Sequence, residues 1–271
     1  MESTVQLPKI VLFGDSLTDW AFNEYNAGFG WVLEEEYKGK AELTDCVCTN
    51  RYTSSMLAPN FEKIISRAKN PNAPPTLLFT IFLGANDACL PPWSGHVPLD
   101  KYEANLRAFV ETILSTKAMT DTKIVLITPP PINIRESLPD SPIGSNSEDL
   151  QASLEEEKKA RGYRTYMNKK QYAEKVMEIA ESYVALTDRV IGLNFWKSLI
   201  DTALEQQGRL NAEDAYDENK LPGCGLPGAK EFKKGFFTDG LHFGPLAYKL
   251  LSEDLITAVL QKWPELGKYK L

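Results

Sequence analysis

The feature that most constrains the fold is the segment 76–83, Thr-Leu-Leu-Phe-Thr-Ile-Phe-Leu, which carries apolar side chains at almost every position. A strand with one face in water alternates apolar and polar residues, so a continuous apolar run of this length is typical of a strand buried on both faces. Such strands occur in parallel sheets covered by helices. The run therefore favours an α/β protein.

Shorter apolar runs and helical patterns alternate along the rest of the chain. Strands are expected at 10–13, 42–48, 76–83, 123–128 and 190–193. Helices are expected at about 20–37 (interrupted at Gly28 and Gly30), 55–67, around 102–114, 169–183, 196–207 and from Pro245 onward. This alternation predicts one domain over residues 1–271, a three-layer α/β/α fold with a mostly parallel five-stranded sheet.

Two segments break the alternation without dividing the chain into two cores. The first, at about 132–162, is polar and rich in charge and turns. It is predicted to be a solvated insertion, with a cover over a site as the alternative. The second, at about 208–235, is predicted to be a loop.

The overall charge excludes some classes of partner. The formal net charge of −7 and the isoelectric point near 5.1 argue against binding to nucleic acid or to an anionic membrane. No apolar run is long enough to cross a bilayer. The first residues lack a basic segment followed by an apolar one, so we expect no signal peptide and a cytoplasmic location. Oligomeric state is left open, homo-oligomers included.

Metal and cofactor sites are not expected. The four cysteines form no CxxC pair and no disulfide framework, and the two histidines are far apart in the sequence. No cluster of ligands with zinc spacing is present. We therefore predict that the protein works without a metal or a cofactor.

A candidate nucleophile lies directly after the first strand, where the chain turns at Gly14-Asp15-Ser16. A serine on a turn that follows a buried strand is rigidly held and yet exposed, as an alcohol nucleophile must be. The alternative is that Ser16 only caps the next helix.

The segment 236–243 supplies a candidate base and a group to orient it. Asp239 and His242 are three residues apart, so in a helix-like turn the carboxylate can reach one ring nitrogen while the other faces outward. The alternative is that both residues cap the final helix. The competing base, His96, has no carboxylate nearby to orient it and is expected at the surface.

Acyl transfer also needs donors aimed at the oxyanion of the tetrahedral intermediate. Ser16, Asn50 and Asn86 each follow a predicted strand, and in parallel sheets the carboxyl ends of the strands meet at one edge. The Asn86 amide and the backbone N–H groups of Ser16 and of a residue after the second strand are the candidate donors. For Asn86 the alternative is a residue that closes an Asx turn.

Three of these segments together resemble a known family. Gly14-Asp15-Ser16-Leu17, Gly84-Ala85-Asn86-Asp87 and Asp239-Gly240-Leu241-His242 are similar to three of the four signature blocks of the GDSL, or SGNH, hydrolases. The longer strings at 82–89, 97–99, 128–131 and 238–243 resemble the isoamyl acetate-hydrolysing esterase branch. The resemblance spans roughly residues 8–262.

The resemblance implies a flavodoxin-like fold and a metal-independent esterase that acts on carboxylic esters. It implies Ser16 as nucleophile, His242 as base, Asp239 as the group that orients the base, and Asn86 in the oxyanion hole. The second block departs from the family pattern, because no glycine occurs between Lys40 and Leu83. Asn50 falls at or near the position of the missing glycine, and asparagine tolerates left-handed backbone angles well.

The sequence thus predicts a serine esterase for small to medium carboxylic esters, of the acetate-ester type, that works through an acyl-enzyme. The alternatives are an acetyl-sugar deacetylase, a thioesterase, a lysophospholipase, or a catalytically silent member that binds a small acyl or sugar ligand. The aromatic residues Trp20 and Phe243 are the candidates for binding the substrate, with burial in the core as the alternative.

Overall fold

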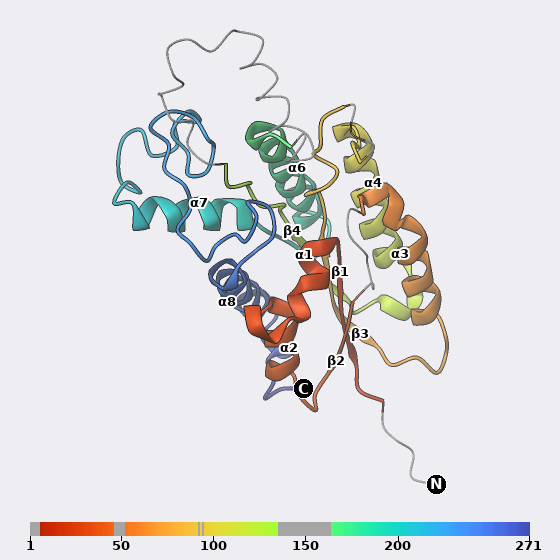
Figure 1. Ribbon diagram of the computed structural model, residues 1–271. Helices are drawn as coiled ribbons and strands as arrows, with labels where there is room; N and C mark the ends of the chain where they lie inside the picture. The colour runs from red at the N-terminus through yellow and green to blue at the C-terminus, as the bar shows by residue number, and fades with distance from the viewer. Residues whose placement is uncertain (1–5, 46–51, 92, 94, 135–163) are drawn as a thin grey trace.

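A computed structural model describes residues 6–45, 52–91, 93, 95–134 and 164–271 of the chain (Figure 1). Its centre is a five-stranded sheet in the order β2-β1-β3-β4-β5, in which every neighbouring pair is parallel. The strands are β1 (Lys9–Gly14), β2 (Glu42–Asp45), β3 (Thr76–Phe82), β4 (Lys123–Ile127) and β5 (Val190–Leu193). This is the flavodoxin-like strand order, so the predicted fold class is confirmed.

Helices cover both faces of the sheet, as Figure 1 shows. One layer consists of α3 (Ser54–Ala68), α4 (Leu99–Ser115) and α6 (Tyr166–Val184). The other contains α2 (Phe29–Glu36), α7 (Phe195–Gln206) and α8 (Pro245–Lys262). Short 3₁₀ turns lie at Trp20–Phe22, Glu24–Asn26, Lys117–Met119 and Pro264–Leu266.

Each strand divides its side chains between two cores. In β1, Ile10 and Leu12 pack with the layer of α2, α7 and α8, whereas Val11 and Phe13 pack with α3, α4 and α6. The strand period of two places successive residues on opposite faces, so a strand between two helical layers must be apolar throughout. This is the physical reason for the continuous apolar run in β3.

The helix predicted over 20–37 is confirmed over 29–36, where α2 lies, and is wrong over 20–28. A four-residue helix α1 (Ser16–Asp19) starts directly at the turn after β1, because the Asp15 carboxylate accepts a hydrogen bond from the Leu17 backbone N–H. The chain then turns through two 3₁₀ segments, and Asn23 caps the second. A Cβ on Gly28 would lie 2.1 Å from the Ala21 carbonyl oxygen, so the chain packs against itself here before α2 begins.

Other predicted bounds need small corrections. Helix α6 begins at Tyr166, three residues earlier than predicted, because the Thr165 hydroxyl caps it at Asn168 N. Of the strand predicted at 42–48, residues 46–48 lie outside the described residues, as do residues 135–162 of the predicted insertion. Residues 208–235 contain turns but no helix or strand.

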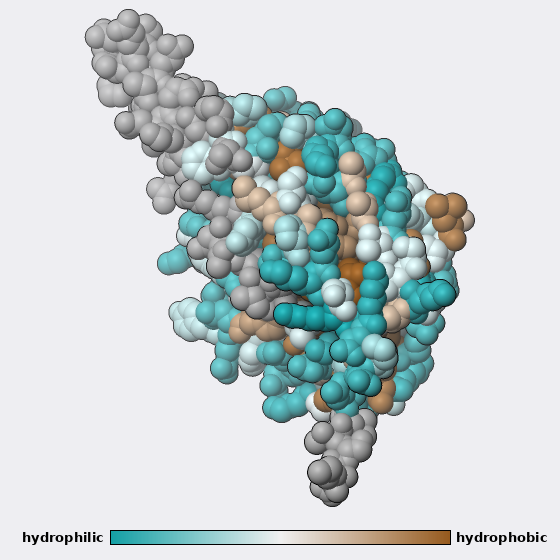
Figure 2. Space-filling view, turned by 90° about the vertical axis from the view of Figure 1, so that its right-hand side faces the viewer, coloured by the Kyte–Doolittle hydropathy of each residue, from teal (hydrophilic) through white to brown (hydrophobic). Residues whose placement is uncertain are grey.

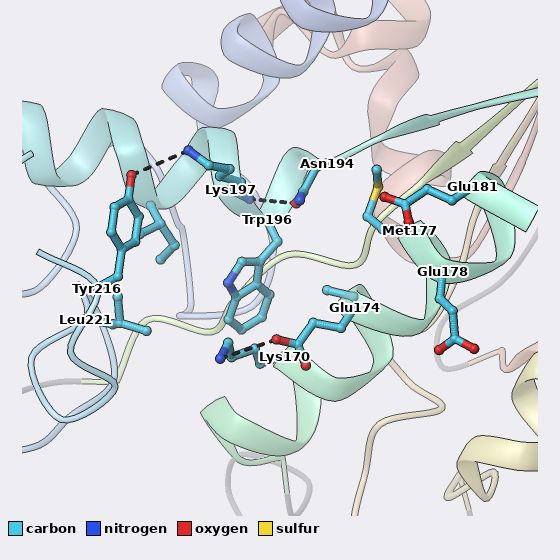
Figure 3. A pocket seen from close by; sticks show the side chains of 12 residues that line it. Lys170, Glu174, Met177, Glu178, Glu181, Asn194, Trp196, Lys197, Tyr216 and Leu221 are labelled. Carbon is cyan, nitrogen blue, oxygen red and sulfur yellow. Dashed lines mark hydrogen bonds and ion pairs between the residues drawn. The ribbon is translucent and has the colours of Figure 1, made fainter. Parts of the chain in front are cut away.

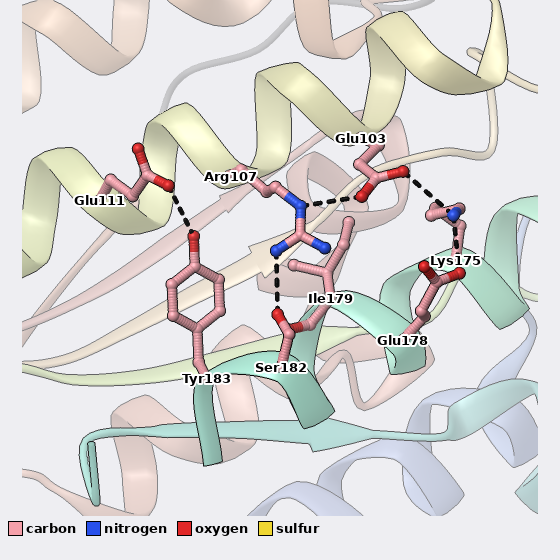
Figure 4. A network of polar contacts seen from close by, with 8 residues as sticks. All are labelled: Glu103, Arg107, Glu111, Lys175, Glu178, Ile179, Ser182 and Tyr183. Atoms are coloured by element: carbon pink, nitrogen blue, oxygen red, sulfur yellow. Dashed lines mark hydrogen bonds and ion pairs between the residues drawn. The ribbon is translucent and has the colours of Figure 1, made fainter. Parts of the chain in front are cut away.

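A network of polar side chains joins α4 to α6 (Figure 4). Arg107 donates to Glu103 (2.8 Å) and to Ser182 (2.9 Å), and Lys175 lies 3.0 Å from the other oxygen of Glu103. Tyr183 donates to Glu111 at 3.2 Å. Single exposed ion pairs contribute little, but a network with several shared partners fixes the position of one helix on the other.

The outer face of the α3 and α4 layer is mainly hydrophilic, with apolar residues in small separate groups (Figure 2). Among the described helices, none combines the length and the hydropathy that a membrane span requires.

Candidate active site

Ser16 lies just beyond the carboxyl end of β1, at the first position of α1. Asp15 before it is buried, and its Oδ1 accepts the Leu17 N–H at 3.0 Å. A Cβ at Gly14 would lie 2.7 Å from the Phe82 carbonyl oxygen and 2.0 Å from Thr18 Oγ1, so only glycine lets the turn approach β3 this closely. The tight turn fixes the serine in place but leaves it only 5% exposed, so the expected exposure of this residue is not observed.

Asp239 and His242 lie on a loop that closes on itself just before α8. The Thr238 N–H donates to the His242 carbonyl at 2.9 Å, and Asp239 Oδ1 accepts the N–H groups of Leu241 (2.9 Å) and His242 (2.8 Å). Gly240 has a φ of +84°, a value that L side chains rarely adopt. These contacts hold the carboxylate beside the imidazole of the same loop.

Ser16 and His242, 226 positions apart in the sequence, are in hydrogen-bond contact. Ser16 Oγ lies 3.0 Å from His242 Nε2, and His242 Nδ1 lies 2.7 Å from Asp239 Oδ2. An ionised carboxylate can only accept, so Nδ1 carries the proton and Nε2 is free to accept from the serine hydroxyl. This is the geometry in which a histidine can deprotonate a serine.

The environment keeps Asp239 ionised. Partial burial raises the pKa of this carboxyl, but hydrogen bonds from the His242 ring and from two backbone N–H groups outweigh burial and lower the pKa. One face of the imidazole stacks on the Trp20 indole, with ring centroids 4.1 Å apart and planes inclined by 20°. The ring is therefore oriented at one edge by the carboxylate and over one face by the indole.

Asn86 lies on the loop after β3, and Gly14 of β1 pairs with Phe82 of β3. The serine and the asparagine therefore follow adjacent strands, at the point where the order of the sheet reverses and ligands commonly bind. The Asn86 side chain is 3% exposed, and its Nδ2 donates to the Tyr52 carbonyl at 2.9 Å.

Asp87, the residue after Asn86, is hydrogen-bonded to the first residue of α3. Its Oδ1 accepts from the backbone N–H (2.9 Å) and the hydroxyl (2.5 Å) of Ser54. Burial raises the pKa of Asp87 to about 7. The side chain therefore anchors the loop that carries Asn86 to the start of α3.

The other predicted site residues have mixed outcomes. Asn50 lies outside the described residues. Trp20 is half-buried against His242, whereas Phe243 is 0% exposed and packs on Phe82, Phe195 and Tyr248, so no ligand reaches its ring. His96, which was expected at the surface, is half-buried, with Nδ1 2.6 Å from the Cys89 carbonyl oxygen.

The sequence reasoning missed two basic residues near these loops. Arg164 Nη2 lies 2.6 Å from Asn86 Oδ1, and its Nε donates to the Ala85 carbonyl at 3.0 Å. Lys169 on α6 is 0% exposed. A signal existed for the lysine, because it falls at a core-facing position of the helical pattern between Tyr166 and Ala173.

Lys169 and Asp15 influence each other through space. Burial and the positive charge of Arg164 lower the pKa of Lys169 to about 7, although the charge of Asp15 opposes them. Burial raises the pKa of Asp15 to about 6, although the Leu17 N–H and Lys169 oppose it. Two buried titratable groups thus influence each other electrostatically at the turn that carries Ser16.

No group of three or more metal-ligating side chains occurs within the described ranges. A cavity of about 390 Å³ opens between α6, α7 and the 208–235 loop, with Trp196 and Tyr216 in its wall (Figure 3). None of Ser16, Asn86 and His242 lines this cavity.

Comparisons with known proteins show which family the chain resembles. The family model for GDSL-like lipase/acylhydrolase matches residues 10–255. A GDSL esterase/lipase of Arabidopsis thaliana is 37% identical over 128 residues, 46% of this chain and 51% of its own length. An isoamyl acetate-hydrolyzing esterase 1 homolog of Rattus norvegicus is 33% identical over 134 residues, 48% of this chain and 51% of its own length. The chain thus spans about half the length of these curated relatives.

Among solved structures, an acetyl xylan esterase superposes with a TM-score of 0.59 at 16% sequence identity, covering 93% of this chain and 99% of that one. At 16% identity, this similarity shows a shared fold and nothing about the reaction.

Proposed function

Because the chain belongs to the GDSL-like lipase/acylhydrolase family, we propose that it is a serine esterase that hydrolyses carboxylic esters through an acyl-enzyme. The observation that carries the proposal is the unbroken line of hydrogen bonds from Ser16 Oγ through the His242 ring to Asp239. A serine hydroxyl alone is a poor nucleophile, and a base held in this position is what makes it reactive.

In the first half-reaction, Ser16 Oγ attacks the carbonyl carbon of the ester while its proton moves to His242 Nε2. The imidazolium that forms is stabilised by Asp239, which stays ionised because hydrogen bonds lower its pKa. The tetrahedral intermediate then collapses, the bond to the alcohol oxygen breaks, and His242 returns the proton to the departing alcohol.

In the second half-reaction, a water takes the place of the alcohol. His242 accepts a proton from the water, the hydroxide attacks the acyl carbon, and the acid leaves as Ser16 Oγ recovers its proton. No metal or cofactor takes part in this scheme.

The negative charge on the carbonyl oxygen needs donors in both half-reactions. In our proposal they are the backbone N–H of Ser16, the side-chain amide of Asn86 and a backbone N–H at or near Asn50. Support comes from the pairing of β1 with β3, because it makes Ser16 and Asn86 neighbours at one edge of the sheet. Loss of one such donor commonly costs about 3 kcal/mol of transition-state stabilisation.

We propose acetate esters of small alcohols as the preferred substrates. The rat relative is named for isoamyl acetate hydrolysis, and the indole of Trp20 offers a half-buried apolar surface against the catalytic imidazole. Acetylated sugars, thioesters and lysophospholipids are the alternatives that a substrate panel separates. The protein is proposed to act in the cytoplasm.

The test is hydrolysis of p-nitrophenyl acetate, butyrate and octanoate by the wild-type protein and by Ser16→Ala. We expect the acetate to be hydrolysed fastest, and Ser16→Ala to lose at least ~10³-fold in kcat. Full activity in Ser16→Ala would refute the assignment of the nucleophile. No turnover of any ester or thioester, together with thermal stabilisation by a small acyl or sugar ligand, would favour a silent binding protein.

The two histidines provide a matched control. His242→Ala is expected to lose activity to the same extent as Ser16→Ala, whereas His96→Ala keeps kcat within about threefold of the wild type. Equal losses in both variants would contradict the assignment of the base.

A further inference from the structure

Arg164 contacts the loop after β3 from the chain segment just before α6. Its guanidinium donates from Nε to the Ala85 carbonyl (3.0 Å) and from Nη2 to Asn86 Oδ1 (2.6 Å). Its backbone also forms an antiparallel bridge with Cys89. One arginine thus holds both the main chain of this loop and the Asn86 side chain.

The chemistry of the guanidinium determines how the Asn86 amide is oriented. A guanidinium has donors and no acceptor, so the amide atom that faces it must be the oxygen. The amide nitrogen is then on the opposite side, where it donates one of its two N–H groups to the Tyr52 carbonyl at 2.9 Å. If the amide rotated by 180°, its NH₂ would face the guanidinium and its oxygen would face a carbonyl.

The arginine directly precedes the N-cap of α6, and this helix contacts the same loop. Residues Asn168 and Tyr172, four apart and therefore on one side of α6, donate to the carbonyls of Ala88 (2.6 Å) and Val97. The polar network of Figure 4 fixes α6 against α4. The start of α6 is therefore a stable support for the loop.

We infer that Arg164 is a positioning residue for the oxyanion hole, which it serves by holding the Asn86 amide so that its second N–H is available to the developing oxyanion. The inference rests on the proposed esterase function and adds a residue to it. In this inference Arg164 acts through Asn86, to which its guanidinium donates.

A double-mutant cycle on kcat tests this coupling. We expect Arg164→Gln to lower kcat about 10- to 100-fold with KM within about threefold, because the oxyanion carries its charge only in the transition state. In the Asn86→Ala background, the same change should lower kcat by less than about threefold. An equal loss in both backgrounds would mean that Arg164 acts independently of Asn86, and would overturn the inference.

Arg164→Lys separates orientation from charge. Lysine keeps the positive charge but lacks the planar fork that spans Ala85 O and Asn86 Oδ1, so kcat should remain at least about fivefold below the wild type. Wild-type kcat in Arg164→Lys or in Arg164→Gln would refute the orienting role. Arg67→Lys, at an exposed position in the last turn of α3, is the matched control and is expected to keep kcat.

Two further measurements keep the outcomes distinct. Thermal unfolding shows which variants are folded. If Arg164→Gln does not fold, the double-mutant cycle uses Arg164→Lys instead. Labelling of wild-type Ser16 by a fluorophosphonate, together with ester turnover, reports on the esterase function itself. An active, labelled wild type with unaffected Arg164 variants refutes only the positioning role, whereas an inactive, unlabelled wild type refutes both.

Discussion

Lys169→Met removes a charge that the fold buries beside the turn carrying Ser16. The side chain of Lys169 is 0% exposed, and its Nζ has no hydrogen-bond partner within the described part of the chain. Burial is the main reason that its pKa falls from 10.5 to about 7. Methionine has a similar length and no charge to desolvate.

The sign of the effect follows from proton binding in the two states. Between pH 7 and 10.5 the unfolded chain holds a proton on Lys169 that the folded protein lacks, so the free energy of unfolding rises with pH. The slope for one such group is about 1.4 kcal/mol per pH unit, which amounts to about 3 kcal/mol between about pH 8 and pH 10. Below pH 7 the group is charged in both states, and its unfavourable contribution is constant.

We therefore expect Lys169→Met to be more stable than the wild type near pH 7 and to lose about 3 kcal/mol of this advantage between about pH 8 and pH 10. The measurement is urea unfolding at one-unit steps of pH for both proteins. Lys63→Met, at an exposed position of α3, is the control and should follow the wild-type curve in parallel. A difference between Lys169→Met and wild type that stays constant with pH would refute the reasoning.

Three further substitutions address the loop around His242. Asp239→Asn should lower kcat about 10³- to 10⁴-fold with little change in KM, because the amide no longer stabilises the imidazolium; a loss below tenfold would contradict its role. Gly240→Ala should lower the free energy of unfolding by about 1–3 kcal/mol, since φ is +84° and a Cβ would lie 2.7 Å from the Asn133 carbonyl oxygen. Urea midpoints that coincide with the wild type would refute this. Trp20→Leu should reduce kcat/KM about 2- to 10-fold through loss of the stacked ring, and an unchanged value would show that the indole does not orient His242.

Much of the fold was predictable because the relevant signals are local. The runs that became β1, β3, β4 and β5 are apolar on both faces, and only a strand between two helical layers requires that pattern. The family resemblance is confirmed by the match over residues 10–255. The segment 20–28 was mispredicted as helix, because its breaks depend on a cap at Asn23 and on close packing of Gly28 against Ala21.

The sequence shows that Ser16 and Asn86 follow strands and that Asp239 and His242 are three residues apart. These features are predictable because periodicity and turn chemistry involve near neighbours. The contact of Ser16 with His242 spans 226 positions, and that of Asn86 with Arg164 spans 78. Hydrogen bonds between such distant residues depend on how strands and helices pack, which no local pattern encodes. The sequence alone therefore determined the layers of the fold and which side chains reach the edge of the sheet. The tertiary structure decided which of them meet, and showed the half-buried Arg164 and the buried Lys169 near them.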